Sequence, residues 1–285
     1  MQALTLTSLF LGLLFSTSRA VPVSRSISST LYDNLVLYTQ YSSAAYQLVC
    51  PSPLGQTLVQ SFSEGDTQGF IAQDDTRQEI VVSFRGTSSI ADAFTDIDLL
   101  LVPLVTPGLT ETFDVHSGFL AAYNSVAEVV LAAVTAQVAK FPTYTLVVTG
   151  HSLGASIAAL AAVDLKTALP DATLQLYTFG QPRTGDANWA AFAESTIGVD
   201  NIFRGVHTFD GVPTIIPQAL GYEHHATEYW QFEDPILLES PPSTVKQCVG
   251  GEDPTCSDSI PSTGINAAHV FYFGQVMAVN PLLCV

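Results

Sequence analysis

The 285-residue sequence is poor in basic side chains: nine Lys and Arg stand against 26 Asp and Glu, a formal net charge of −17 at pH 7. Such a surface repels phosphate backbones and anionic lipid headgroups, so we expect no nucleic-acid partner. Charged residues make up only 12% of the chain, whereas 47% are hydrophobic, enough to bury one sizeable core. The composition therefore predicts a single folded domain.

Metal-binding patterns are also absent. No C-x-x-C or H-x-x-x-H spacing occurs, so we expect no metal. No Asn begins an N-x-Ser/Thr triplet, so no N-linked glycan is predicted. We find no internal repeat and no low-complexity linker.

Long apolar runs are rare, and the clearest one lies at the start of the chain. Residues 4–15 are mainly apolar, and small residues at Ser18 and Ala20 suit signal peptidase. This run is too short to span a bilayer, and no later window of twenty residues is apolar without interruption. We expect residues 1–20 to be a signal peptide, residues 21–285 to form the secreted domain, and no permanent membrane span to occur.

Secretion changes the meaning of the cysteines, because an oxidising compartment favours disulfides. There are four: Cys50, Cys248, Cys256 and Cys284. Of the three possible connectivities, pairing Cys248 with Cys256 closes a short loop rich in Gly, Asp and Pro. This pairing leaves Cys50 to tie the first helix to Cys284 near the carboxyl terminus.

Segments with strand and helix patterns alternate along the chain. The predicted helices are Thr30–Gln47, Ser117–Lys140 and Ser152–Leu169, and the predicted strands include Glu79–Phe84, Thr143–Thr149, Leu174–Phe179 and Asn201–Phe209. This alternation predicts an α/β fold with a mostly parallel central sheet covered by helices on both faces. Ligands of such sheets bind beyond the carboxyl ends of the strands.

A G-x-S-x-G pattern covers residues 150–154, between the strand VVT and the helical segment ASIAALAAVDL. Glycines on both sides of Ser152 permit the sharp turn from strand to helix that lifts a serine hydroxyl clear of the sheet. The amino terminus of the following helix also points at any oxyanion that forms there. The pattern therefore predicts that Ser152 is a nucleophile. The alternative is a tight turn without a catalytic role.

A serine hydroxyl needs a base and an orienting carboxylate, which follow the serine in the order Ser, Asp, His in this fold. Asp210 is the predicted acid, because it ends the strand NIFRGVHTF and opens the turn D-G-V-P. Its rivals Asp164, Asp186 and Asp200 lack such a position. A turn-capping role for Asp210 is the alternative.

His269 is the predicted base, because it is the only histidine after the last predicted strand. His116 precedes the serine in the chain, and His151 lies inside the turn, where its ring cannot reach the neighbouring hydroxyl, so we assign it a packing role. For His207, His224 and His225 we favour a structural role over a catalytic one. For His269 the alternative is a buried histidine without a catalytic role.

With these residues in place, the chain resembles the secreted fungal triacylglycerol lipase family, lipase class 3, which also contains the type A feruloyl esterases. The resemblance runs from about Leu31 to Cys284. It is carried by the segments SFRGTSS, VHSGF, VTGHSLGAS, LYTFGQPRTGD, HTFDGVP and GYEHHATEYW. It implies an α/β-hydrolase fold, a Ser152-Asp210-His269 triad, no cofactor, and the Cys50–Cys284 bridge.

The resemblance also implies the means of stabilising an oxyanion. The residue after the Arg-Gly pair, here Thr87, contributes to the oxyanion hole in this family, together with the backbone N–H of the residue after the nucleophile, here Leu153. The feruloyl esterases have an extra cysteine pair near the lid that this chain lacks.

Between Thr87 and V-H-S-G-F lies a predicted amphipathic helix at about residues 88–101, which Ser88 or Ser89 can cap. Its apolar face includes Ile90, Ala93, Phe94, Ile97, Leu100 and Leu101. In the lipases that the chain resembles, such a segment is a lid that opens at an oil surface, and the lid residues here are Ile90, Phe94 and Ile97. The alternative is an ordinary surface helix.

The apolar lid favours acylglycerols as the ester substrate, met at a lipid–water interface, and we expect a monomer. Ala155 after Gly154 is instead similar to the feruloyl esterase and partial-glyceride lipase branches, so plant cell-wall phenolic esters are the alternative substrates. A non-catalytic binding module is the remote alternative, against which the intact Ser152, Asp210 and His269 argue.

Overall fold

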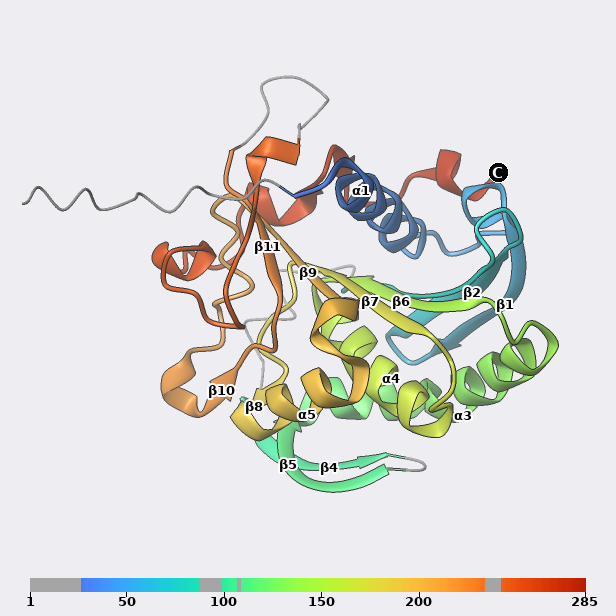
Figure 1. Cartoon of the computed structure of the whole chain (residues 1–285), viewed down its shortest axis with the longest axis horizontal. Helices are drawn as coiled ribbons and strands as arrows, with labels where there is room; N and C mark the ends of the chain where they lie inside the picture. The colour runs from blue at the N-terminus through green and yellow to red at the C-terminus, as the bar shows by residue number, and fades with distance from the viewer. Residues whose placement is uncertain (1–26, 88–98, 107–108, 234–241) are drawn as a thin grey trace, which may run out of the picture.

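The computed structural model describes residues 27–87, 99–106, 109–233 and 242–285 (Figure 1). A central sheet of eight strands runs through it in the order β1-β2-β3-β6-β7-β9-β11-β12. The strands are β1 (Thr57–Glu64), β2 (Thr67–Asp74), β3 (Glu79–Phe84), β6 (Thr145–His151), β7 (Leu174–Phe179), β9 (Ile202–His207), β11 (Glu228–Gln231) and β12 (Val245–Gln247).

The middle of this sheet is parallel. Strands β3, β6, β7, β9 and β11 pair in parallel with their neighbours, whereas β1, β2 and β12 pair in antiparallel fashion at the two edges. The prediction of a mostly parallel sheet is confirmed. The carboxyl ends of the five parallel strands consequently meet at one edge, where the predicted site residues follow β3, β6 and β9.

Helices cover both faces of the sheet (Figure 1). Helix α1 (Ser29–Ala44) lies on one face, and α3 (Ser117–Lys140), α4 (Leu153–Ala168) and α5 (Ala187–Ile197) lie on the other. Side chains alternate along β6: Val147 packs in the cluster that includes α1, and Leu146 and Val148 pack in the cluster that includes α3 and α4. Burial on both faces explains the continuous apolar runs Ile80–Val82 in β3 and Leu146–Val148 in β6.

Helix α3 is long and apolar enough to cross a membrane by length and composition, with a mean hydropathy of 1.6. Its buried side chains, Phe119, Leu120, Tyr123, Val126, Ala127, Val130 and Val134, all belong to the core cluster between the sheet and α4. Its accessible positions include Glu128 and Lys140. These contacts identify α3 as a core helix of the domain.

A second sheet of four short strands, which the sequence analysis did not predict, lies beside α5 (Figure 1). Its order is β10-β8-β5-β4, with β4 (Leu101–Thr106), β5 (Leu109–His116), β8 (Gly185–Asp186) and β10 (Tyr222–Glu223). Leu101 pairs with His116 in this sheet, so the predicted lid helix cannot extend to residue 101 as expected. Residues 88–98, with the lid residues Ile90, Phe94 and Ile97, lie outside the described residues.

The chain ends with short elements that return to the carboxyl edge of the central sheet. They are the 3-10 helix Ala267–Val270, the hairpin β13 (Phe271–Tyr272) and β14 (Gln275–Val276), and the 3-10 helix Pro281–Cys284. Hairpin β13–β14 contacts α1 and β9. It therefore brings His269 back to the edge that holds Ser152.

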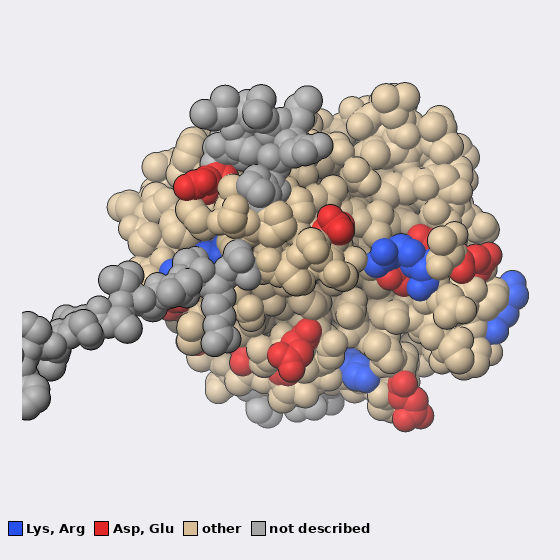
Figure 2. All heavy atoms as spheres, turned by 45° about the horizontal axis from the view of Figure 1, so that its top comes forward, with Lys and Arg blue, Asp and Glu red and all other residues tan. Residues whose placement is uncertain are grey.

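Charged side chains are sparse on the face drawn in Figure 2, where they stand apart in small groups on a mostly uncharged surface. This distribution agrees with the 12% of charged residues in the sequence. The negative net charge is therefore not gathered into one patch on this face.

Candidate active site

The candidate nucleophile Ser152 lies between β6 and α4. Its backbone has φ 58° and ψ −128°, a conformation that non-glycine residues rarely adopt and that clusters at functional sites. A Cβ at Gly150 would lie 2.2 Å from the Gly154 carbonyl oxygen, and a Cβ at Gly154 would lie 2.5 Å from the Phe84 carbonyl oxygen. Glycine is therefore required on both sides of the serine, because strand and helix approach so closely.

The imidazole of His269 lies next to the Ser152 hydroxyl. Its Nε2 is 2.9 Å from Ser152 Oγ, and both residues are fully buried. His269 belongs to the 3-10 helix Ala267–Val270, whose first turn is capped by the Asn266 side chain. The cap fixes the short helix that carries the imidazole.

Asp210 lies on the far side of the same ring. Its Oδ2 accepts a hydrogen bond of 2.9 Å from His269 Nδ1, and its Oδ1 accepts one of 2.9 Å from the backbone N–H of Val212. Because Nδ1 carries the proton, Nε2 is left to accept the proton of the Ser152 hydroxyl. The structure thus brings together the three residues that the sequence analysis selected, in the order serine, histidine, aspartate.

Tyr272, which the sequence analysis missed, also binds the aspartate. Its hydroxyl donates to Asp210 Oδ2, the oxygen that accepts from His269. Burial, with the nearby Asp210 charge, raises the pKa of Tyr272 well above its ordinary value, so the phenol keeps its proton and acts as a donor. The sequence feature that could have identified this residue is its position, three residues after the predicted base and on the next short strand.

Two further histidines hold the segment around His269. His151 Nε2 donates to the His269 carbonyl at 2.7 Å, and His207 Nδ1 donates to the Ala268 carbonyl at 3.0 Å. Burial, with the adjacent His269, lowers the pKa of His151 well below its ordinary value. Its ring is therefore neutral, and its Nδ1 accepts from the Tyr46 hydroxyl at 2.7 Å. His151, for which we expected only packing, also has this hydrogen-bonding role.

Two of the rival acids, Asp164 and Asp186, have other partners. Asp164, on α4, accepts from the Tyr123 hydroxyl of α3 at 2.5 Å. Asp186 caps α5 by accepting from the backbone N–H of Trp189. Both aspartates therefore serve the helices on one face of the sheet, which leaves Asp210 as the acid beside His269.

The predicted oxyanion-hole residues are Thr87, which directly follows Gly86, and Leu153, which directly follows Ser152. A Cβ on Gly86 would lie 3.2 Å from Ser152 Cβ, so the chain at Gly86 passes directly beside the serine. Within the described part of the chain, the buried Thr87 hydroxyl has no hydrogen-bond partner. Leu153 is the first residue of α4, where backbone N–H groups have no partner inside the helix. Both residues can consequently offer donors next to the Ser152 hydroxyl.

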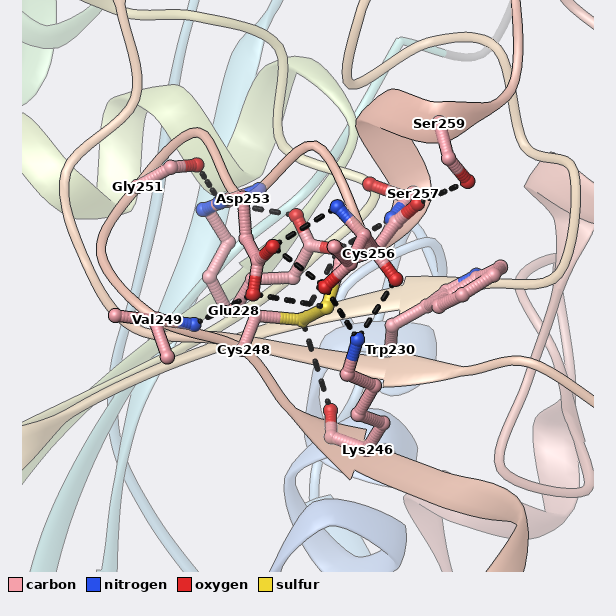
Figure 3. Close-up of a disulfide and its surroundings, with 12 residues drawn as sticks. Glu228, Trp230, Lys246, Cys248, Val249, Gly251, Asp253, Cys256, Ser257 and Ser259 are labelled. Carbon is pink, nitrogen blue, oxygen red and sulfur yellow. Dashed lines mark hydrogen bonds and ion pairs between the residues drawn. A yellow bond between two sulfur atoms is a disulfide. The ribbon is translucent and has the colours of Figure 1, made fainter. Parts of the chain in front are cut away.

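The structure contains disulfides between Cys50 and Cys284 and between Cys248 and Cys256. Among the described residues, one group of potential metal ligands occurs, formed by Glu228 with Cys248 and Cys256. The two sulfur atoms are bonded to each other, as Figure 3 shows, so neither can bind a metal as a thiolate. The disulfide therefore explains why these potential ligand atoms lie close together.

The chain is similar to known proteins in sequence and in fold. Residues 81–220 match the family model described as lipase (class 3). The chain is 38% identical over 224 residues to a lipase from Rhizomucor miehei, an alignment that covers 77% of this chain and 57% of that protein. The chain thus spans less than two thirds of this relative. It is 32% identical over 279 residues to secreted mono- and diacylglycerol lipase A from Penicillium camembertii, covering 90% and 88% of the two chains.

A solved structure is similar over almost the whole fold. It is described as a triacylglycerol lipase whose catalytic centre is a serine protease triad. It matches with a TM-score of 0.75 and 31% identity, and the match covers 92% of this chain and 99% of that one. The fold predicted from the sequence, the α/β-hydrolase fold, is confirmed. The chain belongs to the lipase (class 3) family.

Proposed function

We propose that this protein is a carboxylic-ester hydrolase that acts on acylglycerols through an acyl-enzyme on Ser152. The observation that carries the proposal is the buried chain of contacts from Ser152 Oγ to His269 Nε2 and from His269 Nδ1 to Asp210 Oδ2, each 2.9 Å. It lies at the carboxyl edge of a mostly parallel sheet, where ligands bind in such folds. The related triacylglycerol lipase is described as having a serine protease triad, which supports the same assignment here.

In the proposed reaction, Ser152 Oγ attacks the ester carbonyl while His269 Nε2 takes its proton. Asp210 holds the ring in the tautomer with a proton on Nδ1 and stabilises the imidazolium that forms. The imidazolium then gives its proton to the departing alcohol. A water molecule, activated by the same imidazole, hydrolyses the acyl-enzyme and restores the serine.

The negative charge on the carbonyl oxygen needs donors that already point at it. We assign this role to Thr87 and to the backbone N–H of Leu153, because both border Ser152 without a hydrogen-bond partner among the described residues. Loss of one such donor typically lowers the rate by about 10²–10³-fold. No metal or organic cofactor is needed for any of these steps.

Acylglycerols are the proposed substrates for two reasons. The two relatives compared above are both named as lipases. The name of the Penicillium camembertii relative specifies mono- and diacylglycerols. The sequence of residues 88–98 also has the amphipathic pattern of a lid, with Ile90, Phe94 and Ile97 on its apolar side. We further propose secretion after removal of residues 1–20, which the name of the Penicillium camembertii relative supports.

The test is a comparison of initial rates on a series of triglycerides and diglycerides and on methyl ferulate, each below and above its solubility limit. We expect the rate on glycerides to rise sharply when the limit is crossed, with little turnover of ferulate. Smooth saturation with good ferulate turnover would favour the phenolic esters that Ala155 suggests. Hydrolysis of neither class would overturn the proposal.

A further inference from the structure

The segment that carries Asp210 continues as the acid loop, residues 208–217, and two buried side chains hold its far end. Arg183 Nη1 donates to the Ile216 carbonyl at 2.8 Å, and His224 Nε2 donates to the Pro213 carbonyl at 2.8 Å. Neither side chain belongs to the loop itself. The loop that presents the carboxylate is therefore fixed from outside.

One carboxylate, that of Glu252, holds the Arg183 side chain and the backbone of His224. Glu252 Oε1 accepts from Arg183 Nε at 2.7 Å and Glu252 Oε2 accepts from Arg183 Nη2 at 2.6 Å. Glu252 Oε1 also accepts from the backbone N–H of His224 at 2.8 Å. The Arg183 side chain is 2% exposed and Asp258 Oδ1 lies 3.3 Å from its Nη2. Bidentate ion pairs between arginine and a carboxylate are stronger and more directional than single hydrogen bonds.

Glu252 is in turn fixed by the disulfide loop, residues 248–256 (Figure 3). Asp253 braces this loop by accepting from the backbone N–H groups of Val249 and Thr255. The Gly251 carbonyl accepts from Arg204 at 2.8 Å, and a Cβ at Gly251 would lie 1.8 Å from the His224 carbonyl oxygen. The loop is therefore pressed against the segment that holds His224, with Glu252 directed at both partners.

We propose that Glu252 is a positioning residue for the reaction: by holding Arg183 and His224, it fixes the acid loop and keeps the Asp210 carboxylate against His269. This inference rests on the proposed function, because it concerns the same site. It adds a residue about forty positions from Asp210 that does not touch the candidate triad. A misplacement of a reacting group by 1 Å typically costs about 10²-fold in rate.

The experiment compares the full-length protein with its Glu252→Gln variant, which keeps the shape of the side chain and removes its charge. On a soluble short-chain ester we expect kcat to fall about 10–100-fold with little change in KM. We also expect the acidic limb of the pH–rate profile to move, because Asp210 would stabilise the imidazolium less well. A residue that only stabilised the fold would leave this limb in place.

Glu79→Gln is the matched control. Glu79 is also buried and pairs with Arg77 at 3.1 Å and with the Tyr38 hydroxyl at 2.9 Å, but it lies at the opposite end of β3 from the site. We expect this variant to keep the wild-type kcat and pH profile. An equal loss of kcat in both variants would mean that Glu252 contributes only to the general stability of the fold. This result would overturn the proposal.

A second readout does not depend on activity. Amide hydrogen exchange at residues 211–217 should be faster in Glu252→Gln than in the wild type, whereas exchange in the central strands should not change. Unchanged exchange in this loop would overturn the positioning role even if the protein proved not to hydrolyse esters. If Glu252→Gln does not fold, Arg183→Lys takes its place, because an ammonium cannot reproduce the planar fork that binds both Glu252 oxygens while Nη1 donates to the Ile216 carbonyl.

Discussion

At the scale of single residues, the groups of the candidate triad are oriented by neighbours outside it. Asp210 Oδ2 accepts from both His269 and Tyr272, and His151 binds the backbone carbonyl of His269. Buried polar groups that are fully hydrogen-bonded specify one arrangement, whereas an unpaired one is costly. The imidazole is therefore held in one place and one tautomer before any substrate binds.

The Ser152 hydroxyl is the nucleophile of the proposed reaction. Ser152→Ala should abolish ester hydrolysis, because loss of a triad serine typically lowers kcat by about 10⁶-fold. The circular dichroism spectrum should not change, since alanine removes only the hydroxyl. Residual activity above about 1% in a variant with a wild-type spectrum would contradict the role of Ser152.

Asp164 on α4 carries a buried carboxyl group. Burial raises its pKa, although the hydrogen bond from Tyr123 opposes this shift. A raised pKa in the folded state means that this group favours folding at low pH and that its contribution is lost as the pH rises through that pKa. Asp164→Asn should therefore unfold at a higher temperature than the wild type at pH 7.

The measurement for Asp164 is thermal unfolding of both proteins between pH 3.5 and pH 7. The difference between them should shrink toward the acidic end, where the wild-type carboxyl group is also neutral. Asp171→Asn, an exposed position in the following turn, is the control and should have little effect at any pH. A lower stability of Asp164→Asn at pH 7 would show that the carboxylate is better satisfied than its burial indicates.

At the scale of elements, the strands and helices with regular patterns were predictable. Strands β3 and β7 and helix α3 have the predicted bounds, because apolar runs and a following proline or glycine define them. Strands β8 and β10 were missed because each has only two residues and pairs with a distant segment. The hairpin of β4 and β5 was missed because it begins inside the predicted lid helix and β4 contains Pro103. Contacts between distant residues also explain why Tyr272 and the bonding role of His151 were missed.

The predicted lid helix has Phe94 on its apolar side. Phe94→Asp should reduce hydrolysis of emulsified esters more than hydrolysis of soluble esters, because a charge on the apolar side of the predicted lid helix would oppose contact with lipid. Thr95→Asp adds the same charge on the predicted polar side and should leave the ratio of the two rates unchanged. If Phe94→Asp lowers both rates equally, this segment is not a lipid-binding lid.

At the scale of the whole molecule, the Cys50–Cys284 disulfide joins the segment after α1 to the end of the chain, a separation of 234 residues. The Cys248–Cys256 disulfide spans only 8 residues. Cross-links that close longer loops restrict the unfolded chain more. The two disulfides therefore differ in what they stabilise: the first acts on the fold as a whole, and the second on the loop that holds Glu252.

Removal of the longer bridge in Cys50→Ala/Cys284→Ala should lower the free energy of unfolding by about 2–5 kcal/mol, and by more than removal of the shorter bridge in Cys248→Ala/Cys256→Ala. Urea unfolding monitored by fluorescence measures both. The shorter bridge should matter more for kcat than for stability, because of its link to Glu252. The reverse order of stabilities would mean that the chain ends contribute little to cooperative folding.

The proposed reaction requires that Ser152 carries the acyl group. The measurement is intact-protein and peptide mass spectrometry after reaction with an aryl phosphonate ester, with tributyrin hydrolysis followed in the same samples. We predict one phosphonyl group per molecule, located on Ser152, and loss of hydrolysis in proportion to its incorporation. Full hydrolysis by protein modified at Ser152, or stoichiometric modification at another residue with loss of activity, would contradict the account.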